Sequence, residues 1–128
     1  MLTNAKVQPT LPVVDLERAK KFYEGMLGLK VIGEDPSPGA LLQAGEGTSL
    51  YLYQRAATKA DHTVASFGVK DVEAIVRELK AKGVIFEDVD LPSFKTVEGI
   101  ATMATPAGEF KGAWFKDTEG NILAISNM

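Results

Sequence analysis

The chain has 128 residues, 45% of them hydrophobic, and a formal net charge of −3, which fits a single globular domain. The acidic balance argues against nucleic acid as a partner, because neutralising phosphates requires a basic face. The absence of cysteine excludes disulfides and thiolate metal sites, and no run of about 18 apolar residues is present to span a membrane. We therefore expect a cytoplasmic protein that makes no membrane contact.

The first half of the chain has the pattern of a strand, a helix and three further strands. Residues 6–14 alternate in polarity as a half-buried strand does, and Pro9 and Pro12 indicate an edge strand or a crossing arm. Asp15 is a typical N-cap, and apolar residues at helical spacing continue to residue 27, where Gly28 ends the helix. Residues 30–34, 40–44 and 48–55 then predict three strands.

The second half repeats this order. Residues 63–69 predict a strand, Asp71 caps a helix that ends at Gly83, and residues 84–89, 110–116 and 121–126 predict three strands. Residues 91–108, which include Pro92 and Pro106, predict a long loop. Because long loops in compact domains are often functional, we expect this one to act as a lid or rim.

An internal sequence repeat supports the division of the chain into two similar halves. Residues 46–54 align with residues 119–127 at an offset of 73, whereas the two capping residues Asp15 and Asp71 are 56 apart, so the second copy is 17 residues longer. A lone βαβββ module leaves one face of its sheet bare. The predicted fold is therefore α+β, a single domain over residues 1–128 in which two tandem βαβββ modules, about 5–56 and 62–127, form a curved mixed sheet cup.

Two stretches match a known family. Residues 11–23 read Leu-Pro-Val-Val-Asp-Leu-Glu-Arg-Ala-Lys-Lys-Phe-Tyr and are followed by Leu27-Gly28-Leu29, and residues 115–121 read Phe-Lys-Asp-Thr-Glu-Gly-Asn. With the paired modules, they resemble the vicinal oxygen chelate superfamily of glyoxalase I, extradiol dioxygenases, fosfomycin-resistance enzymes and bleomycin resistance proteins. The resemblance is nearest to the metal-free, bleomycin-binding branch. It implies a homodimer in which the N-terminal arm is exchanged between subunits.

The enzymes of this superfamily hold a divalent metal with His, Gln or Glu side chains at four strand positions. By resemblance, those positions fall on Gln8, Tyr51, Val64 and Ala124, and the repeat pairs Gln8 with Val64 and Tyr51 with Ala124. Only Gln8 is a usual ligand, whereas a catalytic divalent site generally needs about three protein ligands. We therefore expect no metal and no cofactor.

Strand alternation separates an apolar face from a polar one. The apolar set is Val7, Leu11, Val13, Leu50, Leu52, Ala65, Phe67, Val69, Leu123 and Ile125. On the other face, which we expect to line the cup, the predicted ligand-binding residues are Gln8, Thr10, Tyr51, Tyr53, Val64, Ser66, Trp114 and Ala124. Trp114 is placed in the cup and Phe115 in the core beside Leu123, although packing or a dimer interface also explains a tryptophan on a sheet.

The sequence thus predicts a homodimer that binds a small organic molecule, aromatic or cationic, without catalysing a reaction, for sequestration or resistance. One alternative is a glyoxalase- or dioxygenase-like enzyme whose metal lies elsewhere, or in which Tyr51, Gln8 or His62 acts as acid or base. Another is a structural or regulatory subunit whose cup is filled by Tyr51. No catalytic residue can be assigned.

Overall fold

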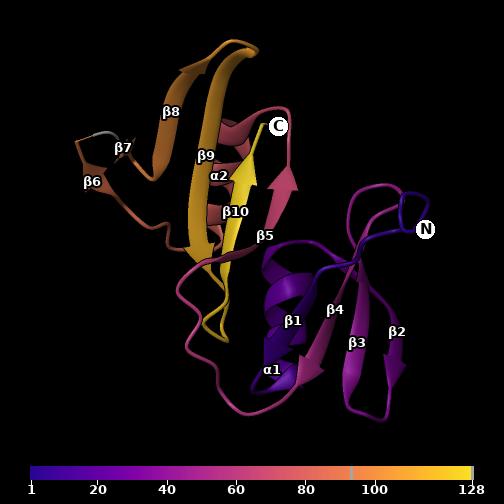
Figure 1. The fold of residues 1–128 in the computed structure, drawn as a ribbon. Helices are drawn as coiled ribbons and strands as arrows, with labels where there is room; N and C mark the ends of the chain where they lie inside the picture. Colours follow the sequence, from indigo (N-terminus) through magenta and orange to yellow (C-terminus); the bar gives the residue numbers. More distant parts are fainter. Residues whose placement is uncertain (93, 128) are drawn as a thin grey trace. The chain divides into compact units, whose positions relative to one another are not determined.

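The computed structural model describes residues 1–92 and 94–127, which form two compact units, Met1–Lys59 and Ala60–Met128 (Figure 1). Each unit contains one mixed sheet and helical structure, so the α+β fold is confirmed. Across the described residues, no helix combines the length and apolar character needed to cross a membrane.

The first unit is a four-stranded sheet with one helical segment. Its elements are β1 (Thr10–Val13), α1 (Leu16–Lys21), the π-helical turn η1 (Phe22–Met26), β2 (Lys30–Asp35), β3 (Gly39–Gln43) and β4 (Ser49–Gln54). The strand order is β1-β4-β3-β2, with β1 parallel to β4 and the other pairs antiparallel.

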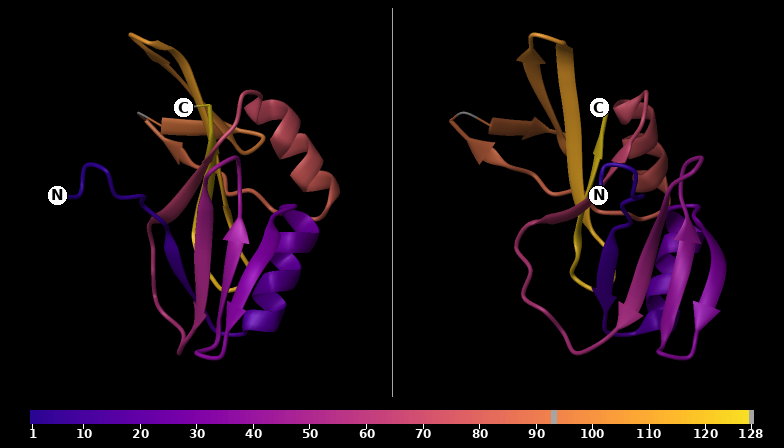
Figure 2. Two further views of the ribbon diagram at one scale, coloured as in Figure 1. Left: turned by 90° about the vertical axis from the view of Figure 1, so that its right-hand side faces the viewer. Right: turned by 45° about the vertical axis from the view of Figure 1, so that its right-hand side comes forward.

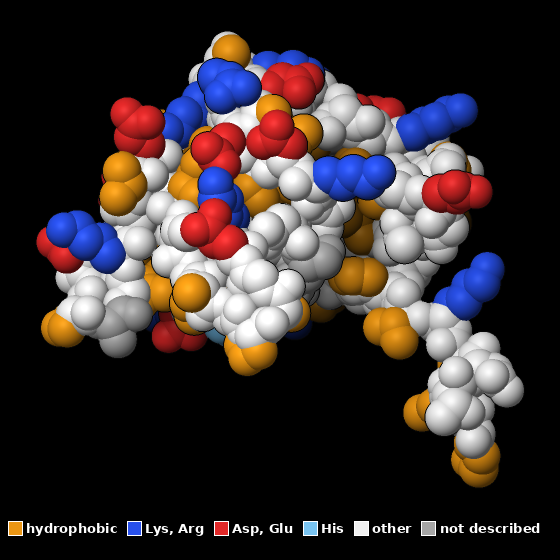
Figure 3. Space-filling view, turned by 90° about the horizontal axis from the view of Figure 1, so that it is seen from above, with side chains coloured by type: hydrophobic (Ala, Val, Ile, Leu, Met, Phe, Trp, Pro, Cys, Tyr) orange, Lys and Arg blue, Asp and Glu red, His pale blue; other side chains and the backbone are white. Residues whose placement is uncertain are grey.

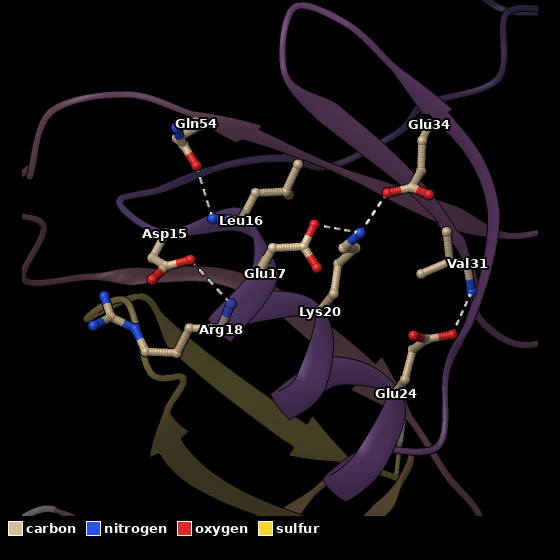
Figure 4. A network of polar contacts seen from close by, with 9 residues as sticks. All are labelled: Asp15, Leu16, Glu17, Arg18, Lys20, Glu24, Val31, Glu34 and Gln54. Atoms are coloured by element: carbon tan, nitrogen blue, oxygen red, sulfur yellow. Dashed lines mark hydrogen bonds and ion pairs between the residues drawn. The ribbon is translucent and has the colours of Figure 1, made fainter.

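The start of α1 is fixed by two side chains that accept its free amide groups (Figure 4). The predicted N-cap is confirmed, because Arg18 N donates to Asp15 Oδ1 at 3.1 Å. Leu16 N donates to Gln54 Oε1 at 3.0 Å, which ties the helix start to the end of β4.

A lysine joins the same helix to the edge strand. Lys20 Nζ pairs with Glu17 at 2.9 Å and also donates to Glu34 of β2 (Figure 4). Hydrogen bonds from the ammonium to Glu34 and then Glu17 raise the pKa of Lys20 above its usual 10.5. One turn further on, Val31 N of β2 donates to Glu24 Oε2 at 3.2 Å.

The helix ends in a wider turn than the sequence predicts. Leu27 N donates to Phe22 O at 3.2 Å, five residues back, so the continuous α-helix expected to residue 27 becomes π-helical from Phe22. This turn buries Phe22 and Tyr23 next to each other, with their rings edge to face at 5.6 Å. Gly28 follows at φ 75°, a conformation that favours glycine and ends the helix.

The second unit has a six-stranded sheet. Its elements are β5 (Thr63–Gly68), α2 (Val72–Ala81), β6 (Asp90–Leu91), β7 (Phe94–Val97), β8 (Ile100–Thr105), β9 (Gly108–Lys116) and β10 (Ile122–Ser126). The order is β5-β10-β9-β8-β7-β6, with β5 parallel to β10. Figure 2 shows α2 against one side of this sheet, and Ala74 N donates to the predicted cap Asp71 at 3.0 Å.

The strand registers of the two units agree with the internal repeat. Thr10 pairs with Tyr51 in the first unit, and their repeat equivalents Ser66 and Ala124 pair in the second. The strand orders also correspond, because β1, β4, β3 and β2 occupy the places of β5, β10, β9 and β8. The tandem βαβββ arrangement is therefore present, with β6 and β7 added to the second copy.

Two sequence predictions about the second unit are wrong. Residues 84–89 do not form a strand but a connector with one bridge, between Phe86 and Phe115. The described part of segment 91–108 is no long loop, because β7 and β8 form a hairpin within it. The hairpin turn is Glu98-Gly99, with φ of 54° and 84°. Two-residue hairpin turns favour a positive φ at both central residues, because this backbone conformation matches the twist of the flanking strands.

The first strand is also shorter than predicted. It begins at Thr10 rather than Lys6, so Val7 lies outside it and is 93% exposed instead of packing in the core. Residues 5–9 therefore form an arm that precedes the sheet.

The helix-side faces of both sheets form the cores. The buried set includes Leu11, Val13, Leu50 and Leu52 in the first unit, and Phe115, Leu123 and Ile125 in the second. Phe115 lies opposite Leu123 and is fully buried, which confirms its predicted core position. Burying each such side chain contributes about 1.5–3 kcal/mol. Phe67 and Ala65 are only half-buried, although their faces are as predicted.

Candidate functional site

On the sheet face opposite α1, the first unit brings a tyrosine to the end of the edge strand. Tyr51 of β4 lies opposite Leu41 of β3, and its hydroxyl donates to Asp35 Oδ2 at 2.6 Å. Ser37 donates to the other carboxylate oxygen through both its amide, at 3.0 Å, and its hydroxyl. We call Asp35, Ser37 and Tyr51 the tyrosine cluster.

Glycine at position 39 makes this cluster possible. Any β-carbon there would overlap the Tyr51 hydroxyl, and it would lie 3.0 Å from Asp35 Oδ2. The tyrosine ring therefore reaches the carboxylate only because β3 has no side chain at its first residue.

The three donors of the tyrosine cluster keep its carboxylate ionised. The Ser37 hydroxyl, the Tyr51 hydroxyl and the Ser37 amide all hold the pKa of Asp35 below its usual 3.8. Asp35 and Ser37 are exposed and Tyr51 is half-buried, so the negative charge of the cluster lies at the surface of the unit.

The remaining candidates of the first unit lie on the same side. Gln8 Nε2 donates to Ser49 Oγ at 2.8 Å, so this side chain is bonded to the neighbouring strand. Thr10 is exposed and pairs in register with Tyr51, and Tyr53 is half-buried two residues along β4. The sequence did not single out Asp35 or Ser37, because they contact Tyr51, which lies 16 and 14 residues further along the chain.

In the second unit, the candidates lie on the sheet face opposite α2. Trp114 pairs with Ala124, and Ala124 pairs with Ser66, so the three residues form one row across β9, β10 and β5. Val64 precedes Ser66 by two residues on the same face, and Ser66 Oγ lies 3.5 Å from Ser126 Oγ.

Two further aromatic residues join Trp114 on this face. The Phe94 and Trp114 rings meet edge to face, with centroids 5.3 Å apart. A β-carbon at Gly112 would lie 3.1 Å from both the Phe110 and the Trp114 ring, so both rings flank this glycine. We call Phe94, Phe110 and Trp114 the aromatic cluster; all three side chains are half-buried.

The sequence pointed to only one member of this cluster. Phe94 was assigned to a loop, and Phe110 carried no signal of its own beyond its two-residue spacing from Gly112. The hairpin of β7 and β8 is what brings Phe94 across to Trp114, and Met103 of β8, opposite Phe110, widens the apolar surface.

The four positions that the resemblance assigns to a metal do not carry suitable ligands. Val64 and Ala124 have no donor atom, and Gln8 and Tyr51 are the only polar side chains of the four. Among residues 1–92 and 94–127, no group of three or more His, Cys, Asp and Glu side chains is placed to hold a metal ion. The His62 side chain is 70% exposed, and its Nδ1 lies 3.8 Å from Asp61 Oδ1.

Comparison with known families fits this fold. The model of the Glyoxalase/Bleomycin resistance protein/Dioxygenase superfamily matches residues 7–125. The chain belongs to this superfamily. A search of curated proteins found no match.

Solved structures with the superfamily fold have diverse origins. An integron cassette protein from the Halifax Harbour sewage metagenome has a TM-score of 0.72 and 16% identity, covering 98% of this chain and 99% of its own. Lactoylglutathione lyase from Agrobacterium tumefaciens has a TM-score of 0.69 and 18% identity, covering 98% and 95%. The antibiotic binding protein TnmS3 from Streptomyces sp. CB03234 has a TM-score of 0.66 and 20% identity, covering 96% of each chain.

Proposed function

We propose that this chain is a cytoplasmic, metal-independent binding protein for a small aromatic compound, nearest in role to the antibiotic-binding members of its superfamily. The observation that carries the proposal is the aromatic cluster on the face opposite α2, in which Phe110 and Trp114 flank Gly112 and Phe94 packs against Trp114. Half-buried aromatic rings beside a position without a side chain offer a surface on which a planar ligand can stack.

The set of residues at the superfamily's metal positions supports binding over metal catalysis. Two of the four positions carry alanine or valine, so a site of about three ligands cannot form there. One structural neighbour with the same fold is named as an antibiotic binding protein, which is a binding role and not a catalytic one.

A thermal-shift screen of aromatic antibiotics and metabolites tests the proposal. A ligand present at 100 times its Kd stabilises the folded state by about 2.7 kcal/mol, which is readily measured as a higher Tm. The shift should disappear in Trp114→Ala and be reduced in Phe94→Ala. Ile85→Ala is the control, because it removes an apolar side chain that is 85% exposed in a connector outside both sheets.

The outcomes separate binding from packing. If Trp114→Ala lowers the Tm of the free protein but leaves the ligand-induced shift unchanged, Trp114 serves packing or an interface and the proposed site is wrong. A homodimer is part of the same proposal, and sedimentation equilibrium of the full chain should give twice the monomer mass of 13.7 kDa.

The tyrosine cluster favours one second candidate, a proton-transfer enzyme. The Tyr51 hydroxyl bonded to the Asp35 carboxylate is a pair that could move a proton at a bound substrate. Lactoylglutathione lyase activity, measured in EDTA and lost in Tyr51→Phe, would support this candidate over pure binding.

A further inference from the structure

A cleft of about 580 Å³ lies on the other face of the second unit, between α2 and the helix side of β7, β8 and β9. This volume falls within the range of about 300–1,000 Å³ that is usual for small-molecule sites. The aromatic cluster is on the opposite face of the sheet, so the cleft is a separate feature.

The cleft follows from the width of the sheet in the second unit. An α-helix about 10 Å in diameter covers roughly two strands spaced at about 4.8 Å. The sheet here has six strands, and α2 packs mainly on β9. The strands β7 and β8 consequently lie to one side of α2 (Figure 1), and their helix-side residues line the cleft.

The cleft has an apolar surface. Val76 of α2 is buried, Ile100 of β8 is half-buried, and Val97 of β7 is 70% exposed. Val97 and Ile100 pair in register across the hairpin, so their side chains form one apolar strip. Covering such a strip would be favourable by about 25 cal/mol per Å² of apolar surface.

Basic side chains outnumber acidic ones around this strip. Four Lys and Arg residues and two Glu residues line the cleft, although the chain as a whole carries a net charge of −3. Figure 3 shows basic and acidic side chains mixed on the face seen from above, with hydrophobic surface visible between them.

Two of the four cations are already engaged. Lys111 pairs with Glu73 and lies 3.7 Å from Glu109, and the hydrogen bond to Glu73 raises the pKa of Lys111 above 10.5. Lys80 Nζ donates to the carbonyl oxygen of Glu98 at 2.8 Å, in the turn of the hairpin.

The other two cations, Arg77 of α2 and Lys95 of β7, come from opposite walls of the cleft. Within residues 1–92 and 94–127, neither has a carboxylate within 4.0 Å. Two such cations beside an apolar strip complement a ligand that has one anionic group on an apolar body.

We propose that this cleft binds a small organic anion with an apolar body, such as an aromatic carboxylate or sulfonate. Arg77 and Lys95 neutralise the anionic group, and the body covers Val97 and Ile100. The site does not depend on the proposed function, because it shares no residue with the aromatic cluster.

NMR titration of the full ¹⁵N-labelled chain tests the site, with naphthalene-1-sulfonate as the probe and the uncharged 1-naphthalenemethanol as its match. The sulfonate should give saturable amide shifts in α2, β7 and β8. The double variant Arg77→Gln/Lys95→Gln should weaken its binding about tenfold or more, as expected for lost hydrogen bonds to a charged group. Lys82→Gln, at the C-cap of α2 outside the cleft, should leave the Kd unchanged.

Three results would overturn the site: equal affinity for the uncharged probe, shifts that centre on Phe94 and Trp114 instead, or no saturation by about 10 mM sulfonate. The variant Trp114→Ala distinguishes this site from the proposed function. It should abolish ligand binding at the aromatic cluster and leave the sulfonate-induced amide shifts in α2 unchanged.

Discussion

The turn between β9 and β10 should depend strongly on one buried carboxylate. Asp117 Oδ1 accepts from Glu119 N and Asn121 N, both at 2.8 Å, and Asp117 Oδ2 accepts from Asn121 Nδ2 at 2.8 Å. Asp117 is 7% exposed and Asn121 is 1% exposed. Asp117→Ala therefore removes the oxygens that accept from two buried donors of Asn121.

The magnitude follows from those two donors. Each buried donor that loses its partner costs about 1–3 kcal/mol, while removal of a buried charge returns part of the carboxylate's desolvation penalty. We expect Asp117→Ala to lower the free energy of unfolding by about 2–4 kcal/mol. This is a large share of the roughly 5–15 kcal/mol that stabilises a typical domain.

The first unit shows how the same turn forms without the carboxylate. The repeat equivalents of Asp117 and Asn121 are Ala44 and Thr48, and there Thr48 Oγ1 donates to Gly45 O at 2.6 Å. Ala44 N donates to Thr48 O at 3.1 Å, as Asp117 N does to Asn121 O at 2.9 Å. The double variant Asp117→Ala/Asn121→Thr should therefore regain at least about 1 kcal/mol relative to the single variant.

Urea denaturation followed by circular dichroism measures both effects, with the slope of the transition checked for constancy. A loss below about 0.5 kcal/mol for Asp117→Ala would refute the reasoning. A double variant that is less stable than the single variant would also refute the reasoning, because the two turns would then not be structurally equivalent.

Three further changes test local features. Tyr51→Phe removes one of the donors that hold the pKa of Asp35 below 3.8, so a ¹³C NMR titration should show a higher pKa for Asp35 in this variant. An unchanged pKa would mean that the Tyr51 hydroxyl does not bond the carboxylate. Glu98→Asn places a residue suited to positive φ in the hairpin turn and should stabilise the fold by about 0.5–1 kcal/mol in thermal unfolding; a destabilised variant would contradict the turn assignment. Lys20→Gln should cost about 0.3–1 kcal/mol at pH 7, as expected for a partly exposed ion pair. Because pairing raises the pKa of Lys20, the stability that it contributes is complete below pH 10.5 and is lost as the pH rises through the raised pKa. If wild-type protein and Lys20→Gln were equally stable already at pH 9, the pairing would be excluded.

The sequence predicted what depends on local pattern and on the repeat. Alternation put Trp114 and Phe115 on opposite faces, because successive residues of a strand point to opposite sides. The small neighbours Gly112 and Ala124 favoured Trp114 for the open face, and Phe115 does lie buried opposite Leu123. The repeat equates Thr10 with Ser66 and Tyr51 with Ala124, and the strand registers agree, because Thr10 pairs with Tyr51 and Ser66 with Ala124.

What the sequence missed depends on contacts between distant segments. The strand β8 has small and polar residues in place of a strong alternation, and the prolines at 92 and 106 on either side made it look like a loop. A Glu-Gly dipeptide between two strands could have indicated the hairpin. Once β8 was missed, neither Phe94 beside Trp114 nor the cleft beside α2 could be foreseen.

The central claim, metal-independent binding of an aromatic compound, is tested most directly through Trp114, the only tryptophan of the chain. Its fluorescence should change saturably during titration with a compound that raises the Tm, with the same Kd in EDTA and in added divalent metal. Saturation that requires a metal, or a bound compound that leaves the fluorescence of Trp114 unchanged, would contradict the claim.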